Sequence, residues 1–289
     1  MVGIRDRQYE IRITYYVLRN AIMAFLQKSF RVMPEIEIID TNSDNIGEFG
    51  FCGYKNVKQQ GYKRKIDWLK RRFAEGLKFK VLHSKDDGAV GFIEYIPGRY
   101  AWRAVEADGF MVIHCIAIMS RKYKGKGYGS LLVDECLGDA KRGRMNGTAV
   151  VTRKGTWMAG RELFLKKGFE VADEAPPDFE LLVRSFKNNA PSPKFTGDWA
   201  ERMHPFRSGL TIIRSDQCPY IDKSVTEISE TAMRNYGVKP KIVQLSDCHQ
   251  AQKAPSAFAI FSILYNGELL TDHPISNTRF TNIMEKIFG

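Results

Sequence analysis

Short apolar runs and amphipathic stretches alternate along most of this chain. Runs of about four to eight apolar or alternating residues are typical of β-strands, whereas apolar positions three or four residues apart are typical of α-helices. Such an alternation of strand and helix patterns predicts an α/β protein. By these criteria the predicted strands are 35–39, 79–83, 89–96, 111–118, 148–152, 179–183, 210–213, 241–245 and 258–264, and the predicted helices are 130–137, 157–167, 223–236 and 278–287.

A glycine-rich turn separates the strand at 111–118 from the helix at 130–137. Glycine lets the backbone turn sharply and approach a ligand closely, and the first amides of a helix are unpaired donors at its positive end. Such a turn can hold a phosphate or pyrophosphate. The spacing fits neither a Walker-type loop nor a Rossmann fingerprint. The predicted phosphate-binding residues are Lys124, Gly125, Lys126, Gly127, Tyr128, Gly129 and Ser130.

The alternating glycines of this turn resemble the acyl-CoA-binding turn of the GNAT N-acetyltransferases, whose pattern is Gln/Arg-x-x-Gly-x-Gly/Ala. Lys124, Gly127 and Gly129 fall on that pattern, with lysine in place of glutamine or arginine. The stretch 164–169, Phe-Leu-Lys-Lys-Gly-Phe, resembles the Tyr-x-Lys-x-Gly-Phe ending of the same family. The resemblance covers residues 36–186 and implies a mixed, mostly antiparallel sheet flanked by helices. It also implies transfer of an acetyl group from acetyl-CoA to an amine of a small molecule or peptide, with the turn amides on the CoA pyrophosphate.

The same resemblance implies that backbone amides of a splayed central strand hold the acyl carbonyl. Donors aimed at a developing oxyanion are a strong catalytic device. In this chain the corresponding strand ends with Ile116, Ala117 and Ile118. These three residues are therefore predicted to contact acetyl-CoA.

Acyl transfer to an amine also needs a base for the amine and an acid for the departing thiolate. Glu94 and His114 lie on predicted central strands and are the candidate bases; a histidine has the right unperturbed pKa for this work. The alternatives are a hydrogen-bonded core histidine and an outward-facing strand glutamate. Many GNAT proteins use a tyrosine as the acid where this chain has Phe164, which cannot donate a proton, while Tyr128 lies nearby in sequence. Cys115 is either a nucleophile or a small buried side chain.

A second predicted domain follows a Pro- and Ser-containing stretch at 188–206. Its order of strand, Cys-Pro-Tyr, helix, strand, proline, hairpin and helix resembles a thioredoxin or glutaredoxin fold, and looks like the YoaP-like C-terminal domain of some bacterial GNAT proteins. The resemblance implies that Cys218 lies at a helix N-terminus, which can lower a thiol pKa, opposite a cis Pro255. Ile221 stands where a resolving cysteine would be. Cys218 is therefore either catalytic or kept in a binding module, and the alternative function is a thiol or redox protein with the GNAT domain as acyl-CoA sensor.

The predicted organisation has four parts. They are an N-terminal extension at 1–32, a GNAT acyl-CoA-binding domain at 33–187, a linker at 188–206 and a thioredoxin-like or YoaP-like domain at 207–289. Met33 is either the functional start or follows an appended helix. No apolar run is long enough to span a membrane. Five cysteines without metal-site spacing indicate reduced thiols, no metal site and a cytoplasmic protein.

The net charge of +11 is concentrated in the first two thirds of the 289 residues, because residues 203–289 carry nine Lys and Arg against eight Asp and Glu. A basic first domain suits a polyanion such as CoA, and it could also suit nucleic acid. The basic runs at 63–65 and 70–72 are interrupted by Ile66, Leu69 and Phe73 at helical spacing. We interpret these charges as the solvated face of a helix, so a nucleic-acid partner is disfavoured.

Overall fold

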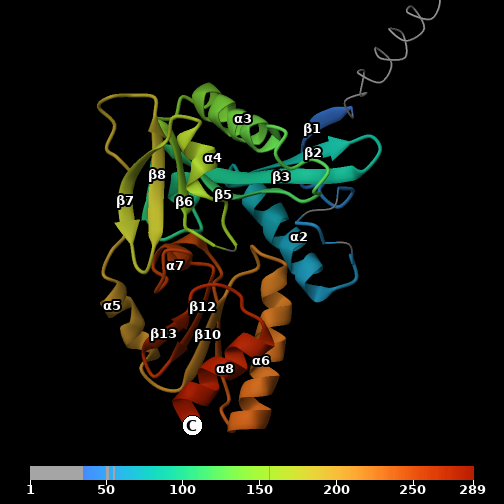
Figure 1. Ribbon diagram of the computed structural model, residues 1–289. Coiled ribbons are helices and arrows are strands. Elements are labelled where there is room, and N and C mark those ends of the chain that lie inside the picture. Colours follow the sequence, from blue (N-terminus) through green and yellow to red (C-terminus); the bar gives the residue numbers. More distant parts are fainter. Residues whose placement is uncertain (1–34, 50–51, 55, 156) are drawn as a thin grey trace, which may run out of the picture.

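The computed structural model describes residues 35–49, 52–54, 56–155 and 157–289 (Figure 1). The predictions made for residues 1–32 and for Met33 lie outside the described residues. Two β-sheets, each covered by helices, make up the described part, and a two-stranded ribbon of β4 (Val105–Glu106) and β9 (Lys194–Phe195) lies beside them. The predicted α/β fold class is confirmed.

The larger sheet has seven strands in the order β1-β2-β3-β5-β6-β8-β7. Every neighbouring pair is antiparallel except β5 and β6, which are parallel. This is the mixed, mostly antiparallel sheet expected from the sequence. The strands are β1 (Ile36–Asp40), β2 (Lys78–Ser84), β3 (Gly88–Pro97), β5 (Phe110–Ile118), β6 (Gly147–Thr152), β7 (Glu170–Ala175) and β8 (Phe179–Ser185).

Helices cover both faces of this sheet (Figure 1). On one face lies α3 (Tyr128–Arg142), whose buried side chains recur at helical spacing and form one apolar cluster with β3, β5 and α4 (Arg161–Leu165). On the other face lie α2 (Gln60–Phe73) and the C-terminal domain, which share a second apolar cluster with the sheet. The strands contribute to both clusters because alternate residues point to opposite faces.

The C-terminal domain has a four-stranded sheet in the order β11-β10-β12-β13. The β10 and β11 pair is parallel and is connected through α6, whereas β12 is antiparallel to both β10 and β13. Asn266 and Gly267 both have positive φ in the turn between β12 and β13, as a two-residue hairpin loop requires. The elements are β10 (Leu210–Arg214), α6 (Tyr220–Tyr236), β11 (Lys241–Gln244), α7 (Cys248–Gln252), β12 (Phe261–Tyr265), β13 (Glu268–Thr271) and α8 (Asn277–Phe288).

Two predicted elements are clearly shorter in the structure, and the strand β7 was missed. The helix predicted at 157–167 is reduced to α4, because Trp157 has positive φ and the backbone at Gly160 is extended. The strand predicted at 258–264 begins only at Phe261, since Ala259 also has positive φ. The edge strand β7 was not predicted, because its polar and mostly exposed sequence lacks an apolar run.

Part of the predicted linker at 188–206 is regular structure. It contains β9, α5 (Trp199–Met203) and a 3₁₀ turn at His204–Phe206. Thr196 joins the two parts of the chain, because its hydroxyl donates to the carbonyl oxygens of both Ala104 and Gln252, at 3.0 and 3.1 Å. The C-terminal domain is thus held against the larger sheet through this segment.

Candidate active site

A gap opens in the larger sheet beside the last residues of β5. The parallel pairing of β5 with β6 ends at Ile113 and Val150, while β5 itself continues to Ile118. On its other side β5 stays paired with β3, and the Met119 N–H donates to Val90 O at 2.9 Å. Because N–H groups alternate along an antiparallel ladder, the N–H groups of Ile116 and Ile118 point towards the gap, and that of Ala117 points towards β3.

A β-bulge on β5 lies next to this gap. Glu94 pairs with Cys115, but its neighbour Tyr95 pairs with Ile113, so His114 is the extra residue. A bulge re-aims side chains and is frequent beside active sites. Here it lets the side chains of both His114 and Cys115 line the same cavity, although consecutive strand residues normally point to opposite faces.

This cavity has a volume of about 160 Å³ and lies between β5 and the loop at 215–219, which we call the Cys-Pro loop. The two domains therefore both contribute to its wall. Trp157 and Tyr220, each about 40% exposed, lie with their ring centroids 6.0 Å apart at its edge. Its lining residues are Cys52, Lys65, Phe92, Glu94, Arg103, His114, Cys115, Ala117, Met119, Trp157, Gln217, Cys218, Tyr220, Phe258 and Ile260.

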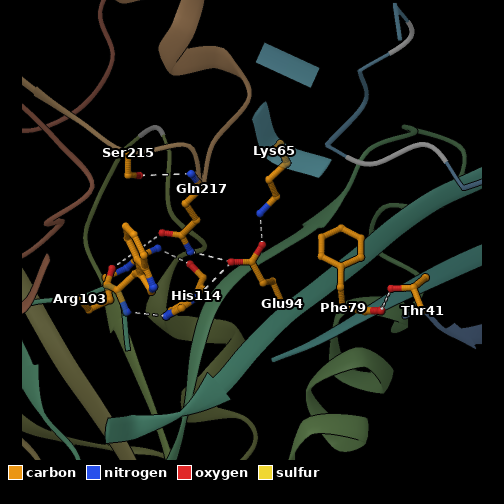
Figure 2. A network of polar contacts seen from close by, with 9 residues as sticks. Thr41, Lys65, Phe79, Glu94, Arg103, His114, Ser215 and Gln217 are labelled. Atoms are coloured by element: carbon orange, nitrogen blue, oxygen red, sulfur yellow. Dashed lines mark hydrogen bonds and ion pairs between the residues drawn. The ribbon is translucent and has the colours of Figure 1, made fainter. Parts of the chain in front are cut away.

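Glu94 is the centre of a buried polar network in the wall of the cavity (Figure 2). Its Oε1 accepts hydrogen bonds from His114 Nδ1 at 3.1 Å and from Gln217 Nε2 at 2.6 Å, and its Oε2 is paired with Lys65 Nζ. Burial opposes ionisation of the carboxyl, but the charge of Lys65 and the hydrogen bond from His114 outweigh it and lower the pKa of Glu94 to about 2. Glu94 is therefore an ionised carboxylate.

His114 has both ring nitrogens occupied. Its Nε2 accepts the backbone N–H of Trp102 at 2.9 Å, so the proton lies on Nδ1 and is donated to Glu94. Burial, aided by the charge of Arg103, lowers the pKa of His114 to about 4 despite the carboxylate beside it. The ring is thus a neutral, hydrogen-bonded histidine that orients Glu94. Because the Nε2 lone pair accepts the Trp102 N–H, His114 has no free lone pair with which to act as a base.

The glycine-rich turn lies at the N-terminus of α3, as predicted. Gly127 precedes the helix in a left-handed conformation with φ 84°, and Gly125 has φ 73°, so both positions favour glycine. The turn is largely exposed, and α3 has neither a side-chain cap nor an acidic residue in its first turn. Its first amides and the side chains of Lys124 and Lys126 are therefore free to meet an anion.

Phe164, at the position of the usual acid, and Tyr128 differ in their surroundings. Phe164 is fully buried and packs edge-to-face on Phe169 with ring centroids 5.5 Å apart. It belongs to the apolar cluster under α3 and offers no proton. Tyr128 lies in the first turn of α3, with its ring 5.9 Å from that of Tyr123. Tyr128 does not line the cavity.

Cys218 lies on the Cys-Pro loop and lines the cavity together with Cys52 and Cys115. The prediction of a lowered thiol pKa is wrong for Cys218. Burial raises its pKa and outweighs the hydrogen bonds from the Tyr220 and Ile221 amides. Burial likewise raises the pKa of Cys115, to about 12, and that of Cys52. All five cysteines of the chain are free.

Pro255 does not face Cys218. The one cis peptide among the described residues is Pro176-Pro177, and Pro255 lines a different hollow with Trp199 and Leu269. Phe258 and Ile260, not Pro255, line the cavity together with Cys218. The predicted position of Pro255 is wrong because β12 begins only at Phe261. The residues between Pro255 and Phe261 form an irregular loop rather than the start of this strand.

Three residues of the network were not predicted. Lys65 is buried on the apolar face of α2 beside Trp68, so the interpretation of the 63–65 run as a solvated face is wrong at this position. Its spacing from Trp68 and Leu69 could have placed it on that face. Arg103 and Gln217 have no signal in the sequence, because they reach the site through loops.

Comparisons with known proteins identify the family of this chain. A model of the YoaP-like family matches residues 241–282. YoaP of Bacillus subtilis (strain 168), described as an uncharacterized N-acetyltransferase, is 31% identical over 253 residues, which are 86% of this chain and 98% of the relative. The chain belongs to the family of this relative, the YoaP N-acetyltransferases. The predicted family, an N-acetyltransferase with a YoaP-like C-terminal domain, is confirmed, whereas the use of acetyl-CoA stays a prediction.

Two solved structures, each described as a putative acetyltransferase, match about half of this chain. YncA of Salmonella typhimurium, solved with acetyl-CoA, has 16% identity and a TM-score of 0.40 over 54% of this chain and 96% of its own. A putative streptothricin acetyltransferase from Bacillus anthracis has 15% identity and a TM-score of 0.38. The match covers 53% of this chain and 98% of that structure. At these scores the likeness supports no conclusion on ligand or mechanism.

No helix in the described ranges is both long and apolar enough to cross a membrane. Within the same ranges no group of three or more His, Cys, Asp or Glu side chains is arranged to hold a metal ion.

Proposed function

We propose that this chain transfers the acetyl group of acetyl-CoA to the amine of a small molecule that binds in the cavity beside β5. One observation carries the proposal. The strand leaves β6 after Ile113, and the same stretch of β5 borders a cavity with an ionised Glu94 in its wall. A volume of about 160 Å³ between two domains favours a small molecule over a peptide as acceptor.

The donor site follows from the free backbone amides. The glycine-rich turn would hold the pyrophosphate of CoA through the first amides of α3 and the ammonium groups of Lys124 and Lys126. The N–H groups of Ile116 and Ile118 point into the gap, where the acyl carbonyl would accept them. Of the three strand residues predicted to contact acetyl-CoA, Ala117 would act through its side chain, which lines the cavity.

The protein groups act mainly by orientation and electrostatics. The amine nitrogen forms the new C–N bond with the carbonyl carbon, and the N–H groups of Ile116 and Ile118 stabilise the charge on the carbonyl oxygen. Glu94 accepts a hydrogen bond from the amine but is too weak a base to keep its proton, which passes to solvent. The C–S bond breaks to release CoA as the thiolate, because Phe164 supplies no proton.

The proposal is tested by incubating the full chain with acetyl-CoA and a panel of small amines. Mass spectrometry of the products and release of free CoA thiol are the two readouts. We expect at least one amine to gain an acetyl group in step with CoA release. Binding of acetyl-CoA without acetylation of any small amine, but with acetylation of a peptide, would overturn the small-molecule acceptor.

The alternative function in thiol chemistry has less support. Cys218 would need to be a thiolate to react, yet burial raises its pKa. We infer that the C-terminal domain has a thioredoxin-like arrangement, which the strand order β11-β10-β12-β13 and the α6 crossover support, but that it serves as a wall of the acceptor cavity. Five free cysteines also support a reducing compartment such as the cytoplasm.

A further inference from the structure

The described residues that line the cavity carry unequal numbers of positive and negative charges. Lys65 and Arg103 are cations, Glu94 is the one carboxylate among them, and His114 is neutral. Lys65 and Glu94 form a direct ion pair in which both side chains are 1% exposed. The guanidinium of Arg103 has no carboxylate partner among these lining residues, so the wall carries a net charge of +1.

Within the described part of the chain Arg103 has no acidic partner, although it is only 2% exposed. Its Nη1 donates to Trp102 O at 2.6 Å and to Gln217 Oε1 at 3.0 Å, and its Nη2 donates to His114 O. Its Nε has no acceptor among the described residues. Burial lowers the pKa of Arg103 only to about 10, so the group stays charged at neutral pH. A buried guanidinium is normally paired with an anion.

We propose that the acceptor is an amine that also carries a carboxylate, and that Arg103 binds this carboxylate. The inference rests on the proposed function, because it names the class of the small molecule in the cavity. A guanidinium binds a carboxylate through a planar fork of N–H donors. The bound anion would bring the net charge of the wall and ligand to zero.

The charge of the wall also favours the reactive form of such an acceptor. An amino acid with a protonated amine is a zwitterion, whereas the form with a neutral, nucleophilic amine is a monoanion. Lys65 and Arg103 lie beside the cavity and disfavour a further positive charge there. The site therefore favours the deprotonated amine, which partly replaces the strong base that Glu94 and His114 do not supply.

The remaining wall favours an apolar body for the acceptor. Phe92, Ala117, Met119, Phe258 and Ile260 all line the cavity. Apolar cavities of about 150 Å³ can take up a molecule the size of benzene. The acceptor class is therefore an amino acid, or a similar amine with a carboxylate, that has a small apolar side chain.

The test compares ligands with and without the carboxylate, and the N-acetylated pair removes the difference in amine basicity between leucine and leucinamide. Leucine and leucinamide serve as acceptors, and N-acetyl-leucine and N-acetyl-leucinamide are titrated as products, so that the result does not depend on turnover. We expect the acids to be preferred by about 10- to 100-fold in kcat/KM or in Kd, as for a hydrogen-bonded charge pair. Arg103→Met should abolish the preference, and Arg103→Lys should retain part of it, while both keep the affinity for acetyl-CoA.

Equal affinity of the wild-type chain for acid and amide would overturn the carboxylate inference while leaving the proposed function intact. A retained preference in Arg103→Met, with acetyl-CoA binding unchanged, would overturn the assignment to Arg103. Failure of the wild-type chain to bind acetyl-CoA would instead reject the proposed function. Acetyl-CoA affinity of each variant also reports that its fold is intact.

Discussion

The polar side chains of the site can be buried because they form hydrogen bonds and an ion pair with one another. The sequence placed Glu94 and His114 on central strands and left open whether either is catalytic. In the structure both ring nitrogens of His114 take part in hydrogen bonds, one with Glu94 and one with the Trp102 amide, so neither is free to accept a proton from a substrate. Nothing in the sequence could have shown this, because the Trp102 contact depends on a loop, and Gln217 reaches Glu94 across 123 positions of the chain.

Replacing Glu94 by Gln should lower both stability and turnover. The change removes the one carboxylate among the described lining residues and leaves Lys65 buried without its partner, a cost of about 3–5 kcal/mol. Urea unfolding would measure this loss, and acetyl-CoA binding should persist in the folded fraction. Glu170→Gln, at an exposed position on β7, is the matched control and should change neither quantity. Wild-type turnover in Glu94→Gln would contradict the role given to this carboxylate.

The pH dependence of stability should carry the signature of His114. Its pKa is about 4 in the folded protein against an ordinary value of 6.5, so the unfolded chain binds the proton first as the pH falls. Stability from this group is complete above pH 6.5 and is lost between pH 6.5 and 4, by on the order of 3 kcal/mol. His114→Gln should lose this part of the slope, whereas His249→Gln, at an exposed position of α7, should keep it. Equal slopes in wild type and His114→Gln would show that the ring is not buried as a neutral group.

At the scale of elements, the glycine-rich turn and α3 could be predicted because their signals are local. The glycine spacing, the strand before it and the amphipathic helix after it are all contiguous in sequence. The bulge at His114 and the parting of β5 from β6 could not be predicted in the same way, because they depend on the register with β3 and β6. The backbone donors were therefore expected on three consecutive residues, whereas alternation turns only Ile116 and Ile118 to the gap.

Gly127→Ala should weaken acetyl-CoA binding. The position has φ 84° and no atom within 4 Å of an added Cβ, so the strain comes from the backbone alone, about 1–2 kcal/mol. Relief of that strain would shift the turn and its amides. Gly209→Ala is a close control, because it has φ 68° and equally open space but lies before β10. Both variants should lose similar stability, and only Gly127→Ala should raise the Kd for acetyl-CoA; an unchanged Kd there would argue against the turn as the CoA site.

At the scale of the whole molecule, the two domains form one site. The apolar cluster that includes α2 continues into the core of the C-terminal domain, and Arg64 of α2 pairs with Asp222 of α6 at 3.1 Å. The sequence predicted both domains from their separate patterns. It could not predict that the Cys-Pro loop lies over the acceptor cavity, since long-range packing of two domains leaves no periodic signal.

Gly61→Ala should separate acceptor turnover from acetyl-CoA binding. An added Cβ at Gly61 would lie 2.2 Å from the carbonyl oxygen of Pro219, so the Cys-Pro loop must move away from α2. We expect KM for the acceptor to rise while the Kd for acetyl-CoA stays at the wild-type value. Gly47→Ala, with no atom within 4 Å, is the control and should match the wild type. An unchanged KM in Gly61→Ala would contradict the claim that this loop forms a wall of the acceptor site.

The central claim is that the full chain binds acetyl-CoA. Isothermal titration of acetyl-CoA into the protein tests it most directly. We predict one binding site per chain, with a Kd within the range of about 1 μM to 1 mM that is usual for enzyme substrates. Absence of binding heat at millimolar acetyl-CoA, with the protein shown to be folded, would contradict the central claim.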